Sequence, residues 1–230
     1  MKTLAIDVGG SHLKASVLNE DGKPMVDRVR VATPVGAPPK TIVGALAELV
    51  ASLPPFDRVS VGFPGVVRKG TVLTAPNLGN DGWKGFRLAE ALAAKLGKPV
   101  KVLNDAEMQG LAVIKNRGVE MVVTLGTGFG SALFVDGSLG PHLELGHHPF
   151  RKGETYDEQL GEAARKRVGK KKWNKRLRQA VENLRVLTAF DHMYIGGGNS
   201  KKVTIELDPD VSLVSNEAGI EGGLAVWREV

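Results

Sequence analysis

Two hairpins of similar sequence, 117 residues apart, constrain the fold of this chain more than any other feature. Runs of apolar residues predict strands at Thr3–Val8 and Leu13–Leu18 in the first hairpin, and at Met121–Leu125 and Ser131–Val135 in the second. Each hairpin turns through glycines, and the constant offset lays the first turn on the second. We interpret this match as an internal duplication, which predicts a protein with two similar halves.

The segments that follow each hairpin alternate between strand and helix patterns, so the predicted fold class is α/β. The other expected strands are Met25–Val31, Arg58–Phe63, Val100–Leu103, His192–Ile195 and Val203–Leu207. The expected helices are Thr41–Ser52, Phe86–Leu96, a helical region from about Tyr156 to Ala189, and a final helix from Glu217. We expect a small N-terminal domain at residues 1–104 and a large C-terminal domain at residues 105–216. The last helix, at about 217–230, is expected to pack back on the first domain.

The composition indicates a globular protein with no membrane partner. Hydrophobic residues make up 42% of the 230 residues, which is enough for a sizeable core. No apolar run reaches the roughly eighteen residues of a membrane span, and the N-terminus lacks the apolar block of a signal peptide, so we expect a cytoplasmic protein. The absence of cysteine excludes disulfides and thiolate zinc sites.

The two glycine turns are candidate phosphate sites, because backbone N–H groups in such a turn can point into one concavity. Neither turn matches a P-loop or a dinucleotide fingerprint, since each leads into another strand. Ordinary hairpin turns are the alternative. Two equivalent turns, each with a hydroxyl among its glycines, favour a phosphate chain held between the halves. The candidate donor-binding residues are Gly9, Gly10, Ser11 and Lys14 around the first turn, and Thr124, Gly126, Thr127 and Gly128 around the second.

Two charged residues flank the first turn. Asp7 precedes it, and a carboxylate at this place can bind Mg²⁺ through water. Lys14 follows it, and its ammonium group can reach a phosphate or can lie in solvent on the strand. We therefore expect Mg²⁺ as a cofactor, with Asp7 as its protein ligand through water.

Five motifs occur in a fixed order along the chain: IDVGGSHLK, LND, LGTGFG, LELGH and YIGGG. In this order they resemble the ROK family of sugar kinases, which has the actin-like ATPase fold. The resemblance covers most of the chain, from Ile6 to the last helix. It implies two RNase-H-like domains with an interdomain cleft that binds a hexose below a phosphoryl donor, and it implies a homodimer.

The LND motif places Asn104 and Asp105 at the end of a predicted strand and before a helix, where active-site residues of open α/β sheets collect. An ordinary N-cap is the alternative for these two residues. The resemblance implies that Asp105 is the general base that takes the proton from the sugar hydroxyl. Phosphoryl transfer is compatible with this role, because it requires positioning, charge stabilisation and one proton acceptor.

A hexose needs side chains that donate and accept hydrogen bonds in fixed directions, and Asn77, Asn104, Glu144 and His147 can do so. The resemblance implies that Glu144 and His147, in an E-x-G-H motif, contact the sugar. Asn77, before Trp83, resembles the sugar loop of the family, although it can also be a turn residue after proline. Glu158 resembles the second sugar-binding glutamate, and its alternative is a helix capping box.

His142, Glu144, His147 and His148 could in principle form a metal site, since His and Glu are zinc ligands. Many ROK proteins carry a cysteine-rich zinc loop directly after E-x-G-H, which helps to position the histidine. This chain has no cysteine, so we expect no zinc. Another group must then position His147.

A strongly basic helix is predicted between Arg165 and Arg185, where ten Lys or Arg residues face a single acid, Glu182. Its apolar residues keep helical spacing, so the charges lie on an exposed face, where they can be merely solvated or can bind a polyanion. The KKKWNKRL stretch, with the missing zinc loop, resembles the polyphosphate glucokinase branch of the family, whose members use polyphosphate and often ATP.

The YIGGG motif and the residue after it resemble the adenosine side of the family's donor site, where glycines allow close approach of a base or ribose. The residues concerned are Gly197, Gly198 and Asn199. A simple strand-to-helix turn is the alternative. If the site is intact, ATP is expected to be a donor beside polyphosphate.

The predicted function is phosphorylation of glucose to the 6-phosphate with polyphosphate or ATP or both; the alternatives are a kinase for mannose or fructose, or a protein of another class. The sugar-responsive regulators of the family that the chain resembles carry a helix-turn-helix domain before the first turn, and we expect none here because Asp7 lies so near the start. A nucleic-acid-binding protein could use the basic helix. We expect a hexose and a polyphosphate or nucleotide as partners, rather than nucleic acid.

Overall fold

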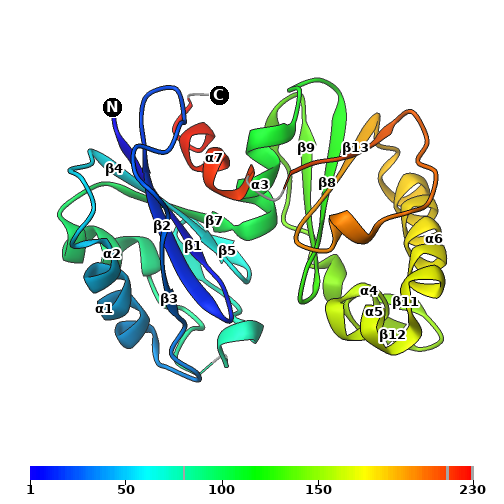
Figure 1. The fold of residues 1–230 in the computed structure, drawn as a ribbon, viewed down its shortest axis with the longest axis horizontal. Coiled ribbons are helices and arrows are strands. Elements are labelled where there is room, and N and C mark those ends of the chain that lie inside the picture. Colours follow the sequence, from blue (N-terminus) through cyan, green and yellow to red (C-terminus); the bar gives the residue numbers. More distant parts are fainter. Residues whose placement is uncertain (80, 216–217, 229–230) are drawn as a thin grey trace. The chain divides into compact units, whose positions relative to one another are not determined.

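The computed structural model describes residues 1–79, 81–215 and 218–228. It divides into two compact units, each considered by itself (Figure 1). The first consists of Met1–Ala112 with the C-terminal segment from Gly219, and the second is Val113–Ala218. In the described ranges, none of the helices has the length and apolar character that a membrane span requires.

The first unit is built on a five-stranded sheet in the order β3-β2-β1-β4-β7. The strands are β1 (Thr3–Val8), β2 (His12–Leu18), β3 (Val29–Ala32), β4 (Arg58–Phe63) and β7 (Val100–Asn104). The first three are antiparallel, whereas β4 and β7 continue the sheet parallel to β1. A small ribbon of β5 (Val67–Arg68) and β6 (Thr71–Val72) and the short 3₁₀ helix η1 (Pro76–Leu78) follow β4.

Helices cover both faces of this sheet. They are α1 (Pro39–Val50), α2 (Leu88–Leu96), α3 (Asp105–Val113) and α7 (Ala218–Ala225). Successive residues of a strand point to opposite faces. Leu4 and Ile6 of β1 thus join the core formed with Ile42 and Leu46 of α1, whereas Ala5 lies against Gly223 of α7.

The C-terminal helix contacts the first unit through specific bonds. Ser60 of β4 donates its hydroxyl to the Gly223 carbonyl at 2.5 Å and accepts a hydrogen bond from the Trp227 indole at 2.8 Å. A Cβ at Gly222 would overlap the carbonyl oxygen of Met108 in α3. The close packing of α7 on α3 therefore depends on glycine at this position.

The second unit repeats the sheet of the first strand for strand, in the order β10-β9-β8-β13-β14. Its strands are β8 (Val119–Leu125), β9 (Phe129–Val135), β10 (Ser138–Leu139), β13 (His192–Gly196) and β14 (Val211–Leu213). Again the first three are antiparallel and the last two run parallel to the first strand. The predicted duplication is confirmed, and so is the α/β fold class.

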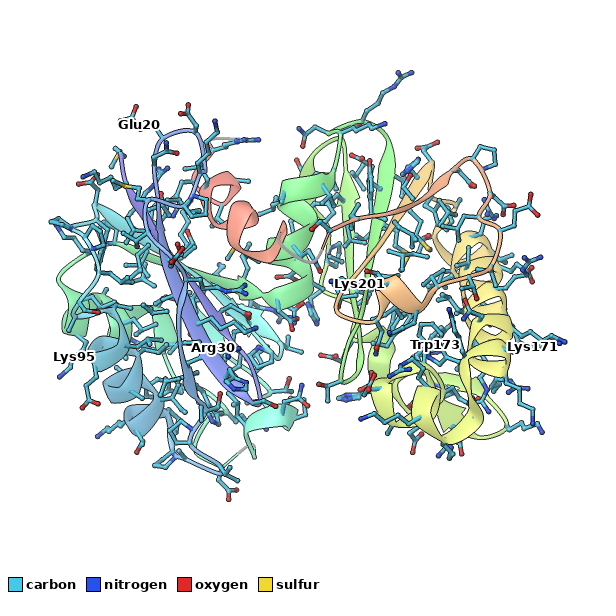
Figure 2. The ribbon with its side chains drawn as sticks, in the orientation of Figure 1. Glu20, Arg30, Lys95, Lys171, Trp173 and Lys201 are labelled. Atoms are coloured by element: carbon cyan, nitrogen blue, oxygen red, sulfur yellow. The ribbon has the colours of Figure 1, made fainter. Side chains whose placement is uncertain are left out.

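Three helices pack on the sheet of the second unit: α4 (Tyr156–Leu160), α5 (Glu162–Val168) and α6 (Lys170–Thr188). Trp173 of α6 is fully buried, and its indole N–H donates to the Leu160 carbonyl at 2.7 Å. Figure 2 shows Trp173 on the inner side of α6 and Lys171 pointing away from the unit. The remaining short elements are η2 (Leu145–His147), β11 (Pro149–Arg151), β12 (Glu154–Thr155) and η3 (Ser200–Lys202).

The strand predicted at Val203–Leu207 is absent, and the strand predicted at Met25–Val31 begins later than expected. Residues 203–207 form no strand, although Val203, Ile205 and Leu207 do pack on the core. Side chains of α6 replace a neighbouring strand here, since Asn174 accepts from the Thr204 N–H and Arg178 donates to the Glu206 carbonyl. The parallel strand is β14 instead.

The third strand begins at Val29 rather than at Met25. Pro24 forms an isolated bridge with Leu18, and the Met25 N–H donates to the Val17 carbonyl. Because the chain then leaves the sheet edge, regular pairing resumes only at Val29. The start predicted for the last helix, Glu217, lies outside the described residues.

Candidate active site

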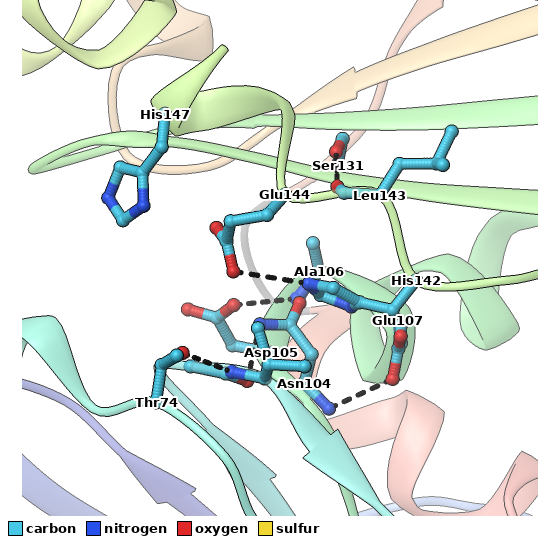
Figure 3. A network of polar contacts seen from close by, with 12 residues as sticks. Thr74, Asn104, Asp105, Ala106, Glu107, Ser131, His142, Leu143, Glu144 and His147 are labelled. Carbon is cyan, nitrogen blue, oxygen red and sulfur yellow. Dashed lines mark hydrogen bonds and ion pairs between the residues drawn. The ribbon is translucent and has the colours of Figure 1, made fainter.

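Asn104 and Asp105 stand where β7 ends and α3 begins. Asn104 is buried; its Nδ2 donates to the Gly65 carbonyl at 3.1 Å, and its Oδ1 accepts from the Ala106 N–H at 2.9 Å. The Asn104 N–H donates to the buried Glu107 carboxylate at 3.0 Å (Figure 3). The side chain of Asn104 therefore fixes the turn that presents Asp105.

Asp105 is exposed at the first turn of α3. Its Oδ1 accepts a hydrogen bond from the Ala106 N–H at 2.8 Å (Figure 3). The N-terminus of a helix favours a negative charge, because its N–H groups are unsatisfied and its dipole is positive there. This position suits a carboxylate that acts as a proton acceptor.

The first glycine turn is tight and is held by Thr33, the residue directly after β3. The Gly9 N–H donates to the His12 carbonyl at 3.0 Å, and the Thr33 hydroxyl donates to the Gly9 carbonyl at 2.6 Å. A Cβ at Gly10 would lie 3.2 Å from the carbonyl oxygen of Asn77. The structure therefore brings the predicted sugar residue Asn77 beside the turn that contains Gly10 and Ser11.

Trp83, which follows Asn77 in the segment that resembles the sugar loop of the family, is a core residue. Its side chain is fully buried and packs on Phe63 and Phe86, with ring centroids 4.9 Å and 5.9 Å away. Its indole N–H has no hydrogen-bond partner within the described residues. Trp83 therefore belongs to the hydrophobic core of the first unit.

Asp7 and Lys14 face each other across the β1–β2 pair, with Oδ2 and Nζ 2.8 Å apart. Each side chain is about one-third exposed, at 34% and 32%. Mg²⁺ commonly binds one or two carboxylates and completes its shell with waters and substrate phosphates. A single, accessible carboxylate beside a glycine turn fits this chemistry. Among the described residues, no three or more His, Asp or Glu side chains gather as a metal cluster.

The second glycine turn is held by neighbouring segments. The Gly126 carbonyl accepts from the Asn199 side chain at 3.1 Å and from the Glu162 N–H at 3.0 Å. A Cβ at Gly197, whose φ is +84°, would lie 2.5 Å from the Leu125 carbonyl oxygen. Gly197 and Asn199 thus lock the segment after β13 onto the turn. Gly198, in contrast, is exposed, and a Cβ at its position would have open space within 4 Å.

An ion pair between Arg165 and Glu162 lies beside this turn. Arg165 hydrogen-bonds the carboxylate of Glu162, at distances from 2.8 Å, and lowers the pKa of Glu162 to about 2. Burial opposes the shift, and Lys166 and Asn199 add to it. Glu162 is therefore ionised at neutral pH at the start of α5.

The E-x-G-H motif forms the 3₁₀ turn η2. Nε2 of His142 lies 3.3 Å from Oε2 of Glu144, and this hydrogen bond lowers the pKa of Glu144 (Figure 3). Glu144 and His147 are both exposed. An ionised Glu144 accepts hydrogen bonds only, which suits it to bind sugar hydroxyl groups.

Glu158 forms the capping box that was its alternative interpretation. Its carboxylate accepts from the Thr155 N–H at 2.8 Å, and its own N–H donates to the Thr155 hydroxyl at 3.3 Å. These bonds lower the pKa of Glu158. The sugar contact of Glu158 stays a prediction.

Asp157 is the site residue that sequence reasoning missed. It precedes Glu158 in the first turn of α4, where acidic residues are common because they favour the helix dipole. Its carboxylate nevertheless contacts both the second glycine turn and His147. No local pattern marks it, since its partner Phe129 is 28 residues away.

The geometry defines a duplicated α/β protein in which each half bears a glycine turn after its first strand, with an exposed aspartate at a strand end of the first half. This is the actin-like ATPase fold, and the predicted fold is confirmed by likeness to solved structures of ROK proteins. The cleft expected between the halves stays a prediction.

The chain belongs to the ROK family, whose model matches residues 3–164. It is 36% identical to a polyphosphate glucokinase of Mycobacterium leprae, over 86% of this chain and 63% of that protein. It is 33% identical to a polyphosphate glucokinase of Mycobacterium tuberculosis, over 94% of this chain and 83% of that protein. The solved polyphosphate/ATP-glucomannokinase of Arthrobacter sp. strain KM superposes with a TM-score of 0.86 at 32% identity, covering 97% and 96% of the two chains.

Proposed function

We propose that this chain is a glucokinase that transfers the terminal phosphoryl group of polyphosphate or ATP to the 6-hydroxyl group of glucose. The observation on which the proposal rests is Asp105, presented at a strand end by the buried network of Asn104 and Glu107. Similarity to the mycobacterial polyphosphate glucokinases and to the Arthrobacter glucomannokinase supports the same reaction.

In the proposed reaction, the sugar hydroxyl oxygen attacks the terminal phosphorus atom, and the bond from that phosphorus to the rest of the donor breaks. Asp105 accepts the hydroxyl proton as the new phosphorus–oxygen bond forms. Asn77, Asn104, Glu144, His147 and Glu158 bind and orient the sugar. The glycine turns bind the donor phosphates, together with Lys14, Thr124, Thr127 and the 197–199 segment.

Mg²⁺, when bound, would neutralise charge on the donor phosphates, and Asp7 would hold it through water. Lys14 would add a positive charge on the same side of the turn, because its ammonium group already pairs with Asp7. We also propose a homodimer and a cytoplasmic location, which both stay predictions.

Two open hollows on the basic helix suit a long polyanion. One, of about 450 Å³, lies between α6 and the 204–206 segment and is lined by Lys170, Lys171, Lys175 and Arg178 among others. The other, of about 330 Å³, is lined by Arg151, Lys152, Lys172, Lys175 and Arg176. Lys175 borders both hollows, so the basic surface is continuous around it. Polyphosphate binding here would be salt-dependent, because it releases counterions.

A charge-reversed variant tests this surface. Lys171→Glu with Lys175→Glu is expected to raise the KM for polyphosphate about tenfold or more and to leave the KM for ATP within about twofold. Both lysines are exposed, so the fold should not change. Steady-state kinetics with each donor at two salt concentrations measure the effect. The exposed pair Lys95→Glu with Lys98→Glu, in the first unit, is the control.

An unchanged KM for polyphosphate in the Lys171→Glu, Lys175→Glu variant would mean that polyphosphate does not bind to this surface of α6.

A gel shift with DNA at physiological salt tests the nucleic-acid alternative. We expect no shifted band.

The function itself is tested by coupling product formation to glucose 6-phosphate dehydrogenase, with Mg²⁺ and each donor in turn. Glucose is expected to react with at least one donor. The same reaction with mannose is followed by consumption of the phosphoryl donor. Consumption with mannose would indicate a glucomannokinase, and none would indicate a glucokinase. Failure of both donors with glucose, mannose and fructose would reject the kinase.

A further inference from the structure

A single carboxylate, that of Asp157, contacts both the second glycine turn and the E-x-G-H turn. Its Oδ1 accepts a hydrogen bond from the Phe129 N–H at 2.5 Å. Its Oδ2 lies 3.8 Å from Nε2 of His147, which is beyond hydrogen-bond distance and within the distance of an ion pair when the imidazole is protonated. Because the two contacts use different oxygens, one side chain can hold both turns at once.

Two motif glycines make room for this carboxylate. A Cβ at Gly128 would lie 2.8 Å from Oδ1 of Asp157, and a Cβ at Gly146 would lie 2.8 Å from the same oxygen. Neither glycine has a left-handed φ, so backbone conformation does not require glycine at these positions. At Gly128 the close approach of the Asp157 carboxylate requires glycine. At Gly146 the same carboxylate and the Phe129 carbonyl oxygen, 2.7 Å from a Cβ, both require it.

The backbone of Asp157 is itself fixed. It lies between Thr155 and Glu158, whose capping box closes the first turn of α4. The Gly161 N–H donates to the Asp157 carbonyl at 2.8 Å, and the neighbouring Tyr156 stacks on Phe150 with ring centroids 4.5 Å apart. The carboxylate is thus presented by a rigid short helix, and its side chain is 34% exposed.

The electrostatic surroundings of Asp157 are mixed. Burial raises its pKa, whereas the Phe129 N–H and His147 counter that rise. Glu144 from the E-x-G-H turn and Glu158 from its own helix add to the rise through repulsion. Its two contacts are therefore the interactions that favour the ionised form.

We propose that Asp157 is a positioning residue that couples the donor turn at residues 126–129 to the orientation of His147. The proposal rests on the proposed function in one respect, the binding of sugar by His147. Asp157 itself acts through these partners and touches neither substrate.

Two variants separate its two contacts. Asp157→Asn keeps an oxygen for the Phe129 N–H and loses the charge near His147. It is expected to raise the KM for glucose about two- to fivefold, with the donor KM unchanged. Asp157→Ala loses both contacts, so both KM values are expected to rise, about tenfold or more for the donor.

Amide hydrogen exchange at Phe129, followed by NMR on the full chain, tests the tether without any substrate. Exchange is expected to be about tenfold faster in Asp157→Ala and close to the wild-type rate in Asp157→Asn. Asp136→Asn is the matched control, because Asp136 also accepts one loop N–H, that of Gly118 at 2.8 Å. Asp136→Asn should change neither the two KM values nor the amide exchange rate at Phe129.

Wild-type exchange at Phe129 in Asp157→Ala, or equal changes of both KM values in Asp157→Asn, would overturn the proposal. Asp157→Asn retains an acceptor for the Phe129 N–H. Its KM values therefore still decide the test if Asp157→Ala fails to fold. A wild-type protein that phosphorylates no sugar would remove the proposed function, and the exchange rates would still decide whether Asp157 tethers the turn.

Discussion

Replacement of Asp105 by asparagine is expected to lower kcat at least about a hundredfold, within the 10²- to 10⁴-fold range typical of a general base. The amide cannot accept the hydroxyl proton. Its oxygen can still accept the hydrogen bond from the Ala106 N–H, so the start of α3 should remain intact. Steady-state kinetics give the loss of turnover, and calorimetric titration with glucose should show binding within about threefold of wild type.

Asp57→Asn is the matched control for this variant. Asp57 also accepts a backbone N–H, from Lys2 at 2.7 Å, in the same unit. It should leave kcat unchanged. Retention of most of the activity in Asp105→Asn would refute the assignment of the base while leaving the family unaffected.

The Gly197→Ala variant is expected to lose about 3 kcal/mol or more in free energy of unfolding. Alanine at a φ of +84° is strained, and its Cβ would lie 2.5–2.8 Å from backbone atoms of Leu125. For a protein of this size, that corresponds to a fall in Tm of about 6–12 °C. Thermal unfolding followed by circular dichroism measures it.

Gly198→Ala is the neighbouring control. Nothing lies within 4 Å of a Cβ at Gly198, so its Tm should stay within about 2 °C of wild type. If Gly198 lies on the adenosine side of the donor site, this variant should raise the KM for ATP and not that for polyphosphate. Equal Tm values for the two variants would contradict the close approach of Gly197 to Leu125.

Local pattern was enough to predict most of the fold. The strands of both hairpins agree with prediction to within two residues, because period-two apolar runs are a local property of the chain. The second hairpin was also tied to the first by a constant offset. Prediction failed at Val203–Leu207, where the same alternation comes from a segment that packs on a helix. Its backbone groups bond the side chains of Asn174 and Arg178 in α6.

The candidate site was only partly predictable, for a related reason. Glycine turns and the E-x-G-H motif are visible in sequence, and the structure places them at ordered turns. The supporting contacts join residues far apart in the chain, such as Asn199 with Gly126 and Asp157 with Phe129. Propensity and spacing do not reveal these pairs, so Asp157 became apparent only in three dimensions.

The central claim, phosphoryl transfer to a sugar hydroxyl group, is tested most directly by ³¹P NMR of wild-type protein with glucose, Mg²⁺ and either polyphosphate or ATP. We expect a growing glucose 6-phosphate resonance with at least one donor, and growth at least about a hundredfold slower with Asp105→Asn. Release of orthophosphate without any sugar phosphate, or no change in either donor, would contradict it.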